Sequence, residues 1–175
     1  MIDLKKHITW QIEEITYEEI YPIWADKLWP GRPKIKPWSA MINATEYSMQ
    51  IKRYAESNFG LYGGKFFGIK TTDTGQVIAI NSGHQCSKTL FRSRGLFVYP
   101  EFTRRGMAQS LLAHTALFAQ ENGFEKIWSY PHEKAMKIYE TVGYTCGEPH
   151  EHQSYKNQDR VDVFRVNAYA ELQLI

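Results

Sequence analysis

The chain has 175 residues, 43% of them hydrophobic and 14% aromatic, which suits one domain with a sizeable hydrophobic core. Its 21 lysines and arginines nearly balance its 19 aspartates and glutamates, so the composition does not indicate nucleic-acid binding. The two cysteines are isolated in sequence, which excludes a disulfide framework and a Cys-x-x-Cys metal site.

No apolar run approaches the roughly 18 residues that a membrane helix needs. Residues 1–7 lack the apolar core of a signal peptide. We therefore expect a cytoplasmic protein that does not contact membranes.

The first third of the chain predicts a strand and two helices. Residues 8–15 alternate between apolar and polar side chains, as a half-buried strand does. Thr16 and Glu19 have the spacing of a capping box and predict the start of a helix, which the prolines of residues 30–33 would end. A second helix is expected within residues 39–57.

The middle of the chain predicts a hairpin, a strand and a long helix. Residues 66–70 and 77–80 flank the turn sequence of residues 73–75, which indicates a β-hairpin. Residues 90–99 have the pattern of a strand, and residues 105–122 that of an amphipathic helix.

Strands and a helix complete the chain. Residues 126–130 predict a short strand and residues 133–142 a helix, and two final strands are expected near residues 144–152 and 161–169. No repeat or linker divides the sequence, so the whole chain, 1–175, is expected to form one α/β domain with helices on the faces of a mixed sheet.

The junction between the strand of residues 90–99 and the helix of residues 105–122 carries the most chemical information. Pro100 stops the strand, a short loop follows, and Gly106 marks the start of the helix. Such a junction gathers unpaired backbone N–H groups at the positive end of the helix dipole, which is a natural seat for phosphate. A tight turn without any ligand would explain this segment, taken alone, equally well.

Two signatures of the chain resemble those of the GNAT superfamily of acyl-CoA-dependent N-acyltransferases. The positions of its acyl-CoA-binding motif are occupied here by Pro100, Phe102, Gly106, Ala108, Leu111 and Leu112. The second signature lies on the helix after the next strand and consists of His132, Ala135, Tyr139, Glu140, Gly143 and Tyr144. The resemblance covers about residues 66–144. It implies a single GNAT-like α/β domain with a mixed, mostly antiparallel, twisted sheet of about six to seven strands, flanked by about four helices.

Two positions depart from the superfamily's pattern. Thr103 stands where the motif has arginine or glutamine, but its backbone N–H can still donate and its hydroxyl can help to cap the helix, so phosphate binding is expected to survive. His132 stands where the second signature has asparagine, which puts in question a side-chain role carried over from that asparagine.

The resemblance implies that the chain uses acetyl-CoA as acyl donor. The residues that it places at the cofactor are Phe97, Val98, Tyr99, Thr103, Arg104, Arg105, Gly106, Met107, Ala108, His132 and Tyr139. The strand at residues 97–99 would hold the pantetheine arm, and the backbone N–H near Val98 would polarise the thioester carbonyl. Arg105 stands where the superfamily commonly carries a basic residue at a CoA phosphate, whereas Arg104 is interpreted as a solvated charge.

Tyr139 resembles the tyrosine that serves many members of the superfamily as general acid toward the departing thiolate. Its phenol is protonated at neutral pH and can donate, although an aromatic residue on the buried side of a helix needs no catalytic role. An amine acceptor is mostly protonated at pH 7, so a base or a water chain would help to form the nucleophile. His84 is a candidate base and Ser129 could order a water, and each is also explained as a structural residue.

A metal is not expected. His150 and His152 could begin a zinc site on one strand face, but the sequence offers no evident third ligand.

These observations predict an acyl-CoA-dependent N-acetyltransferase that transfers the acyl group directly to an amine in a ternary complex. A sensor or adaptor that binds CoA without chemistry is the alternative, and a nucleic-acid protein using the basic loop of residues 32–36 is a weak third. The acceptor stays open among a polyamine, an amino acid, an aminoglycoside and a protein amino group, and a homodimer stays open as well. Aromatic residues that could line an acceptor pocket are Trp24, Trp29, Trp38 and Tyr155.

Overall fold

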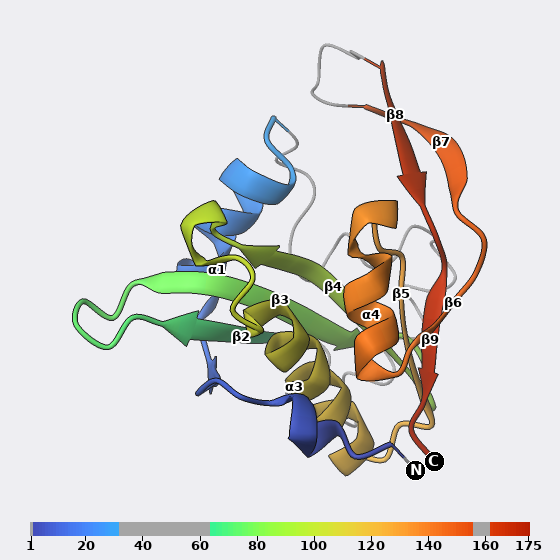
Figure 1. The fold of residues 1–175 in the computed structure, drawn as a ribbon, viewed down its shortest axis with the longest axis horizontal. Coiled ribbons are helices and arrows are strands. Elements are labelled where there is room, and N and C mark those ends of the chain that lie inside the picture. Colours follow the sequence, from blue (N-terminus) through green and yellow to red (C-terminus); the bar gives the residue numbers. More distant parts are fainter. Residues whose placement is uncertain (1, 32–63, 156–161) are drawn as a thin grey trace.

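The computed structural model describes residues 2–31, 64–155 and 162–175 (Figure 1). The described α-helices are α1 (Tyr17–Ile23), α3 (Met107–Glu121) and α4 (Met136–Val142). The larger sheet contains β1 (Glu13–Glu14), β2 (Lys65–Lys70), β3 (Val77–Gln85), β4 (Leu90–Val98), β5 (Lys126–Ser129), β6 (Thr145–Cys146) and β9 (Ala170–Gln173). The smaller sheet consists of β7 (His150–Tyr155) and β8 (Asp162–Asn167).

The seven strands of the larger sheet lie in the order β1-β2-β3-β4-β5-β9-β6, and only β4 and β5 run parallel. A mixed, mostly antiparallel sheet of this size confirms the predicted fold class. The helix expected within residues 39–57 and the basic loop of residues 32–36 lie outside the described residues. No helix in the described ranges is long and apolar enough to cross a membrane.

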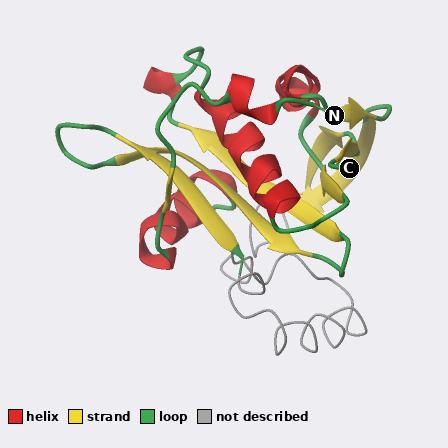
Figure 2. Ribbon diagram, turned by 90° about the horizontal axis from the view of Figure 1, so that it is seen from below, coloured by secondary structure: helices red, strands yellow, loops and turns green. Residues whose placement is uncertain are grey.

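Helices cover both faces of β2 to β4. Successive side chains of a strand point to opposite faces, and both faces of these strands carry apolar side chains that pack against a helix. Figure 2 shows α3 lying across one face. The cluster that joins α3 to this face contains Phe67, Ile69, Ile78, Ala79, Met107 and Leu111. The cluster on the other face, under α1, contains Ile15, Ile20, Ile23 and Ile80.

The start of α1 confirms the predicted capping box. The Glu19 N–H donates to Thr16 Oγ1 at 3.2 Å, and the Thr16 N–H donates to Glu19 Oε2 at 2.8 Å. A π-helical segment, Trp24–Leu28, continues α1, and helical structure ends before Pro30, as expected.

The strand predicted over residues 8–15 is wrong for most of its length, since only β1 pairs with β2. The residues before β1 bond instead to the start of α3. The Thr9 N–H donates to Ser110 Oγ at 3.0 Å, and Trp10 Nε1 donates to the Arg105 carbonyl at 2.7 Å. Contacts with α3 therefore take the place of ladder bonds, so that this segment braces the loop before the helix.

The C-terminal strands also differ from expectation. The single strand predicted over residues 144–152 is divided into β6 and β7, and β9 follows the strand predicted near residues 161–169. β9 lies between β5 and β6. Its buried residues alternate with more exposed ones, which is the pattern of a half-buried strand.

A β-bulge bends β4 in its middle. Ile80 lies opposite Phe97 and Ser82 opposite Arg94, so one residue of β3 faces two of β4, Gly95 and Leu96. Gly95 has φ +77°, a left-handed conformation that suits glycine at a bulge. The bulge turns the second half of β4 away from β5, which pairs with β4 only over Leu90–Arg92. The two parallel strands therefore separate and leave an opening between them.

Candidate active site

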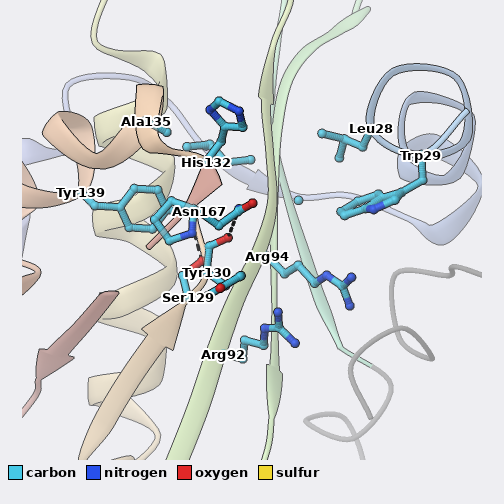
Figure 3. Close-up of a pocket in the computed structure, with 13 residues that line it drawn as sticks. Leu28, Trp29, Arg92, Arg94, Ser129, Tyr130, His132, Ala135, Tyr139 and Asn167 are labelled. Carbon is cyan, nitrogen blue, oxygen red and sulfur yellow. Dashed lines mark hydrogen bonds between the residues drawn. The ribbon is translucent and has the colours of Figure 1, made fainter. Parts of the chain in front are cut away.

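Two pockets lie at this opening and meet at Leu96 of β4 and Ala135 before α4. We call the first the α3 pocket; its volume is about 470 Å³. It is lined by Leu96, Phe97, Val98, Phe102, Thr103, Arg104, Gly106, Met107, Ala108, Gln109, Ala135 and Ile138. We call the second the arginine pocket; its volume is about 330 Å³ (Figure 3). It is lined by Leu28, Trp29, Arg92, Arg94, Gly95, Leu96, Ser129, Tyr130, Pro131, His132, Ala135, Tyr139 and Asn167.

The backbone of β4 offers donors to the opening. The Tyr99 N–H donates to the Ile78 carbonyl of β3 at 3.0 Å. Because successive N–H groups of an extended chain point to opposite edges, the N–H of Val98 points away from β3 and toward the opening. The predicted donor at Val98 therefore faces the α3 pocket. The Tyr99 side chain packs against Phe97 on the α1 face and lines neither pocket.

The backbone at the start of α3 is open to an anion. Gly106 precedes the helix with φ +78°, and no side chain in the described part of the chain caps the N–H groups of the first turn. A Cβ at Gly106 would meet only Thr9 Oγ1, at 3.5 Å, so the space in front of the backbone is open. Arg104 also has a positive φ, +63°, which is uncommon for a residue with a side chain and typical of functional loops.

The expectation that Thr103 helps to cap α3 is wrong. Its hydroxyl donates to the Pro100 carbonyl at 2.9 Å and so closes the turn that follows β4. The uncapped helix start remains available to a ligand. Thr103 itself lines the α3 pocket, as do most of the residues that the sequence placed at the cofactor.

The two arginines of the loop are both exposed but differ in their relation to the α3 pocket. Arg104, interpreted as a solvated charge, lines the α3 pocket. Arg105 lies against the Phe102 ring at 5.5 Å and donates to the Glu101 carbonyl at 3.4 Å, and it does not line either pocket. Arg104 is therefore the arginine of this loop that borders the α3 pocket. The contact of Arg105 with a CoA phosphate stays a prediction.

Tyr139 and Ser129 meet in the arginine pocket. Ser129 Oγ donates to the Ser93 carbonyl at 2.8 Å and lies 3.2 Å from Tyr139 Oη. Because a serine hydroxyl has one hydrogen, Tyr139 is the donor in the second bond. Burial raises the pKa of Tyr139 to about 12, against the opposing effects of the bond to Ser129 and of the nearby Arg92 charge. Tyr139 is therefore a protonated, oriented donor.

His132, which the resemblance placed at the cofactor, lines the arginine pocket and not the α3 pocket, and its contact with the cofactor stays a prediction. Its Nδ1 accepts the Lys134 N–H at 3.3 Å and caps the helical turn before α4. Histidine thus fills the capping role that asparagine commonly has.

His84 lies away from both pockets. It is buried on β3, opposite Arg92 in register, and its Nε2 lies 3.5 Å from Cys86 Sγ. Its role as general base stays a prediction, and so does the ordering of a water by Ser129.

The arginine pocket contains residues that the sequence analysis did not select: Arg92, Arg94 and Asn167. Arg92 and Arg94 are two residues apart on one strand, so their side chains share a face, and this spacing within an apolar strand was a usable signal. Asn167 comes from β8 and could not be placed by any local pattern. Trp29, one of the predicted aromatic residues, does line this pocket, whereas Trp24 is fully buried in the core; Trp38 and the Tyr155 side chain lie outside the described structure.

Among the described residues, no group of three or more histidine, cysteine, aspartate or glutamate side chains is close enough to hold a metal ion. The His150 ring is hydrogen-bonded to the Tyr130 hydroxyl.

Solved structures with the same fold support the assignment of this architecture. The chain is similar to an N-acetyltransferase from Staphylococcus aureus Mu50, with a TM-score of 0.61 and 16% identity over 94% of this chain and 98% of that one. It is also similar to a phosphinothricin acetyltransferase from Sinorhizobium meliloti in complex with AcCoA, with a TM-score of 0.61 and 12% identity over 93% and 87% of the two chains. The chain is similar as well to the Salmonella typhimurium protein yncA, solved with its cofactor acetyl-CoA, with a TM-score of 0.60 and 13% identity over 94% of each chain.

At such identities the likeness establishes the fold alone. Comparison with curated proteins gives no significant match. The family model of the acetyltransferase (GNAT) family, however, matches residues 23–144, which include β4, the start of α3 and all of α4. The chain therefore belongs to the acetyltransferase (GNAT) family.

Proposed function

We propose that the protein transfers an acetyl group from acetyl-CoA to an amine, by direct attack while both substrates are bound. The observation that carries the proposal is the meeting of two pockets at one opening in the sheet, at Leu96 and Ala135. A donor in the α3 pocket and an acceptor in the arginine pocket would come together there without a covalent enzyme intermediate.

The α3 pocket suits the diphosphate and arm of acetyl-CoA. Uncapped N–H groups at the start of α3 and the open space at Gly106 would receive the diphosphate, with Arg104 beside them. The exposed edge of β4 would pair with the amides of the pantetheine arm. The Val98 N–H would donate to the thioester oxygen, where preorganised donors contribute most to catalysis.

Acetyl-CoA supplies a thioester, whose acetyl carbon is open to attack by an uncharged amine. A C–N bond forms and the C–S bond breaks, the amine gives up one proton, and the departing sulfur gains one. Tyr139 would donate that proton, moving its hydrogen bond from Ser129 to the sulfur. Its raised pKa keeps the phenol protonated and available for this donation.

A thiol-release assay tests this function. The protein is incubated with acetyl-CoA and a library of amines, and free CoA is measured with a thiol reagent, while calorimetry measures acetyl-CoA binding. Release that depends on an amine, together with binding, supports acetyl transfer. Binding without release for any amine would instead favour the CoA-binding sensor, which draws support from the absence of acidic residues among the described lining of both pockets.

Replacement of Ala108 by glutamate is expected to weaken acetyl-CoA binding by at least about tenfold, because a carboxylate in the first turn of α3 would repel the diphosphate. The same carboxylate interacts favourably with the helix dipole, so the variant should fold at least as well as the parent. Calorimetric titration measures the affinity, and Ala108→Ser serves as the uncharged control. Equal affinities for Ala108→Glu and the parent would place the diphosphate elsewhere.

The pH dependence of the rate should show no loss of Tyr139 as a donor up to about pH 10. A tyrosine with an ordinary pKa near 10 is half ionised at that pH, whereas a phenol with a pKa of about 12 is still about 99% protonated. With a saturating amine, kcat should rise with pH to a plateau as the amine loses its proton. A decline centred near pH 10 that is absent from Tyr139→Phe would contradict the assigned environment of this tyrosine.

A further inference from the structure

The arginine pocket is cationic on one side. Arg92 and Arg94 project from the same face of β4, and Figure 3 shows the Arg94 guanidinium on the side of Trp29 and that of Arg92 between Arg94 and Ser129 in this view. The Arg94 guanidinium lies 5.0 Å from the centre of the Trp29 ring. None of the described residues that line this pocket is acidic. Its described walls therefore present positive charge and an aromatic surface, and no charge that would attract a cation.

Arg92 is held in place but is not neutralised. Its guanidinium stacks over the Trp128 ring at 4.3 Å, and its Nε is buried without a hydrogen-bond partner. No hydrogen bond or ion pair joins Arg92 to another residue of the described ranges. Partial burial of a cation whose donors are not all hydrogen-bonded costs free energy, because the loss of hydration is not offset until an anion binds.

The described groups that interact electrostatically with Arg92 are neutral at physiological pH. They are Cys86 and Tyr139. Burial raises the pKa of the Cys86 thiol to about 11 and that of Tyr139 to about 12, so neither is ionised near pH 7. Arginine itself stays charged, although burial lowers its pKa. Within the described ranges, the countercharge of Arg92 is thus left for a ligand.

We propose that the acceptor is a small amine that carries an anionic group, a carboxylate or a phosphorus oxyanion, which Arg92 binds through its terminal nitrogens with Arg94 beside it. The planar guanidinium can bind either oxyanion with two parallel hydrogen bonds. The amine end of such a molecule would then extend toward Ser129 and Tyr139, which line the same pocket and where the acetyl group is delivered (Figure 3). Amino acids and aminoalkylphosphonates have this chemistry, whereas polyamines and aminoglycosides would be repelled. This inference rests on the proposed function and restricts the class of amine that accepts the acetyl group.

The test compares amines that differ only in charge. The panel contains α-amino acids and their carboxamides, β-alanine and β-alaninamide, 2-aminoethylphosphonate, and the polyamine putrescine. Thiol release gives kcat/KM for each, and titration into the protein saturated with CoA gives binding without chemistry. We expect the anionic member of at least one pair to be favoured by about tenfold or more, the usual contribution of a charge-assisted hydrogen bond. Comparison of 2-aminoethylphosphonate with β-alanine shows whether the pocket prefers a phosphorus oxyanion or a carboxylate.

Arg92→Met should reduce this preference to within about threefold, chiefly through KM, and Arg92→Lys should restore part of it because the charge remains without the planar fork. Lys88→Met is the control, since it makes the same change of net charge at an exposed residue outside both pockets. Melting temperatures and CoA affinities establish that each variant is folded, and the selectivity of the parent protein decides the matter if Arg92→Met does not fold.

The outcomes separate the two proposals. Equal use of an amino acid and its carboxamide, or a preference for putrescine, would overturn the anionic acceptor and leave acetyl transfer intact. Binding of CoA with no reaction of any amine would overturn acetyl transfer, and anionic amines could still be found to bind beside CoA. An unchanged preference in Arg92→Met would show that another group binds the anion and would overturn the assignment of Arg92.

Discussion

Replacement of Tyr139 by phenylalanine is expected to lower kcat by about 100-fold or more, the range found when a positioned general acid is removed. Affinity for acetyl-CoA should change little, because the phenol lies in the arginine pocket and not along the α3 pocket. The fold should be retained, since Ser129 keeps its bond to the Ser93 carbonyl and the aromatic ring keeps its packing. Steady-state kinetics with thiol detection measure the change.

Tyr144→Phe is the matched control for this prediction. The two rings lie 5.1 Å apart at 79°, but the Tyr144 hydroxyl is buried with no hydrogen-bond partner and Tyr144 lines neither pocket. Removal of an unsatisfied hydroxyl should leave kcat unchanged and stability equal or slightly increased. Similar kinetics for the two variants would show that Tyr139 has no special role in the proton transfer.

Replacement of Gly95 by alanine is expected to destabilise the protein by about 2–4 kcal/mol. The new Cβ would lie 2.1 Å from a ring atom of Trp24, and the residue would have to keep a φ of +77°. Trp24 is fully buried, so the ring has no free space into which to move. Urea or thermal unfolding gives the free-energy difference, and loss of acetyl-CoA binding is expected where the bulge is displaced.

Gly75→Ala separates the two causes. Gly75 also has a positive φ, +69°, but no atom lies within 4 Å of a Cβ placed there. Its substitution should cost only the conformational strain, about 1–2 kcal/mol. If Gly95→Ala and Gly75→Ala destabilise the protein equally, contact with Trp24 does not hold the bulge in its place.

The fold was predictable where short-range patterns coincide with real elements. The capping box at Thr16, the turn between β2 and β3, and the glycine before α3 are local signals, and each lies where the structure places the corresponding element. The strand expected over residues 8–15 failed because its alternation is satisfied by contacts with α3, which lies about 100 residues away in sequence. An alternating pattern shows which side chains are buried, but it does not show which element they pack against.

The site was predictable in its backbone and less so in its side chains. A proline, a glycine and a helix start place the α3 pocket, because they fix local conformation. Arg105 was preferred over Arg104 from its position alone, whereas Arg104, which has a positive φ, is the one that lines the α3 pocket. The arginine pocket joins the end of the π-helical segment Trp24–Leu28, β4, β5, α4 and β8, which no local pattern brings together.

A crystal structure of the protein soaked with acetyl-CoA tests the central claim most directly. The account predicts the diphosphate against the N–H groups of the first turn of α3, close to Gly106, and the thioester oxygen within hydrogen-bonding distance of the Val98 N–H. Density for the cofactor outside the α3 pocket, or a thioester remote from the meeting of the two pockets at Leu96, would contradict it.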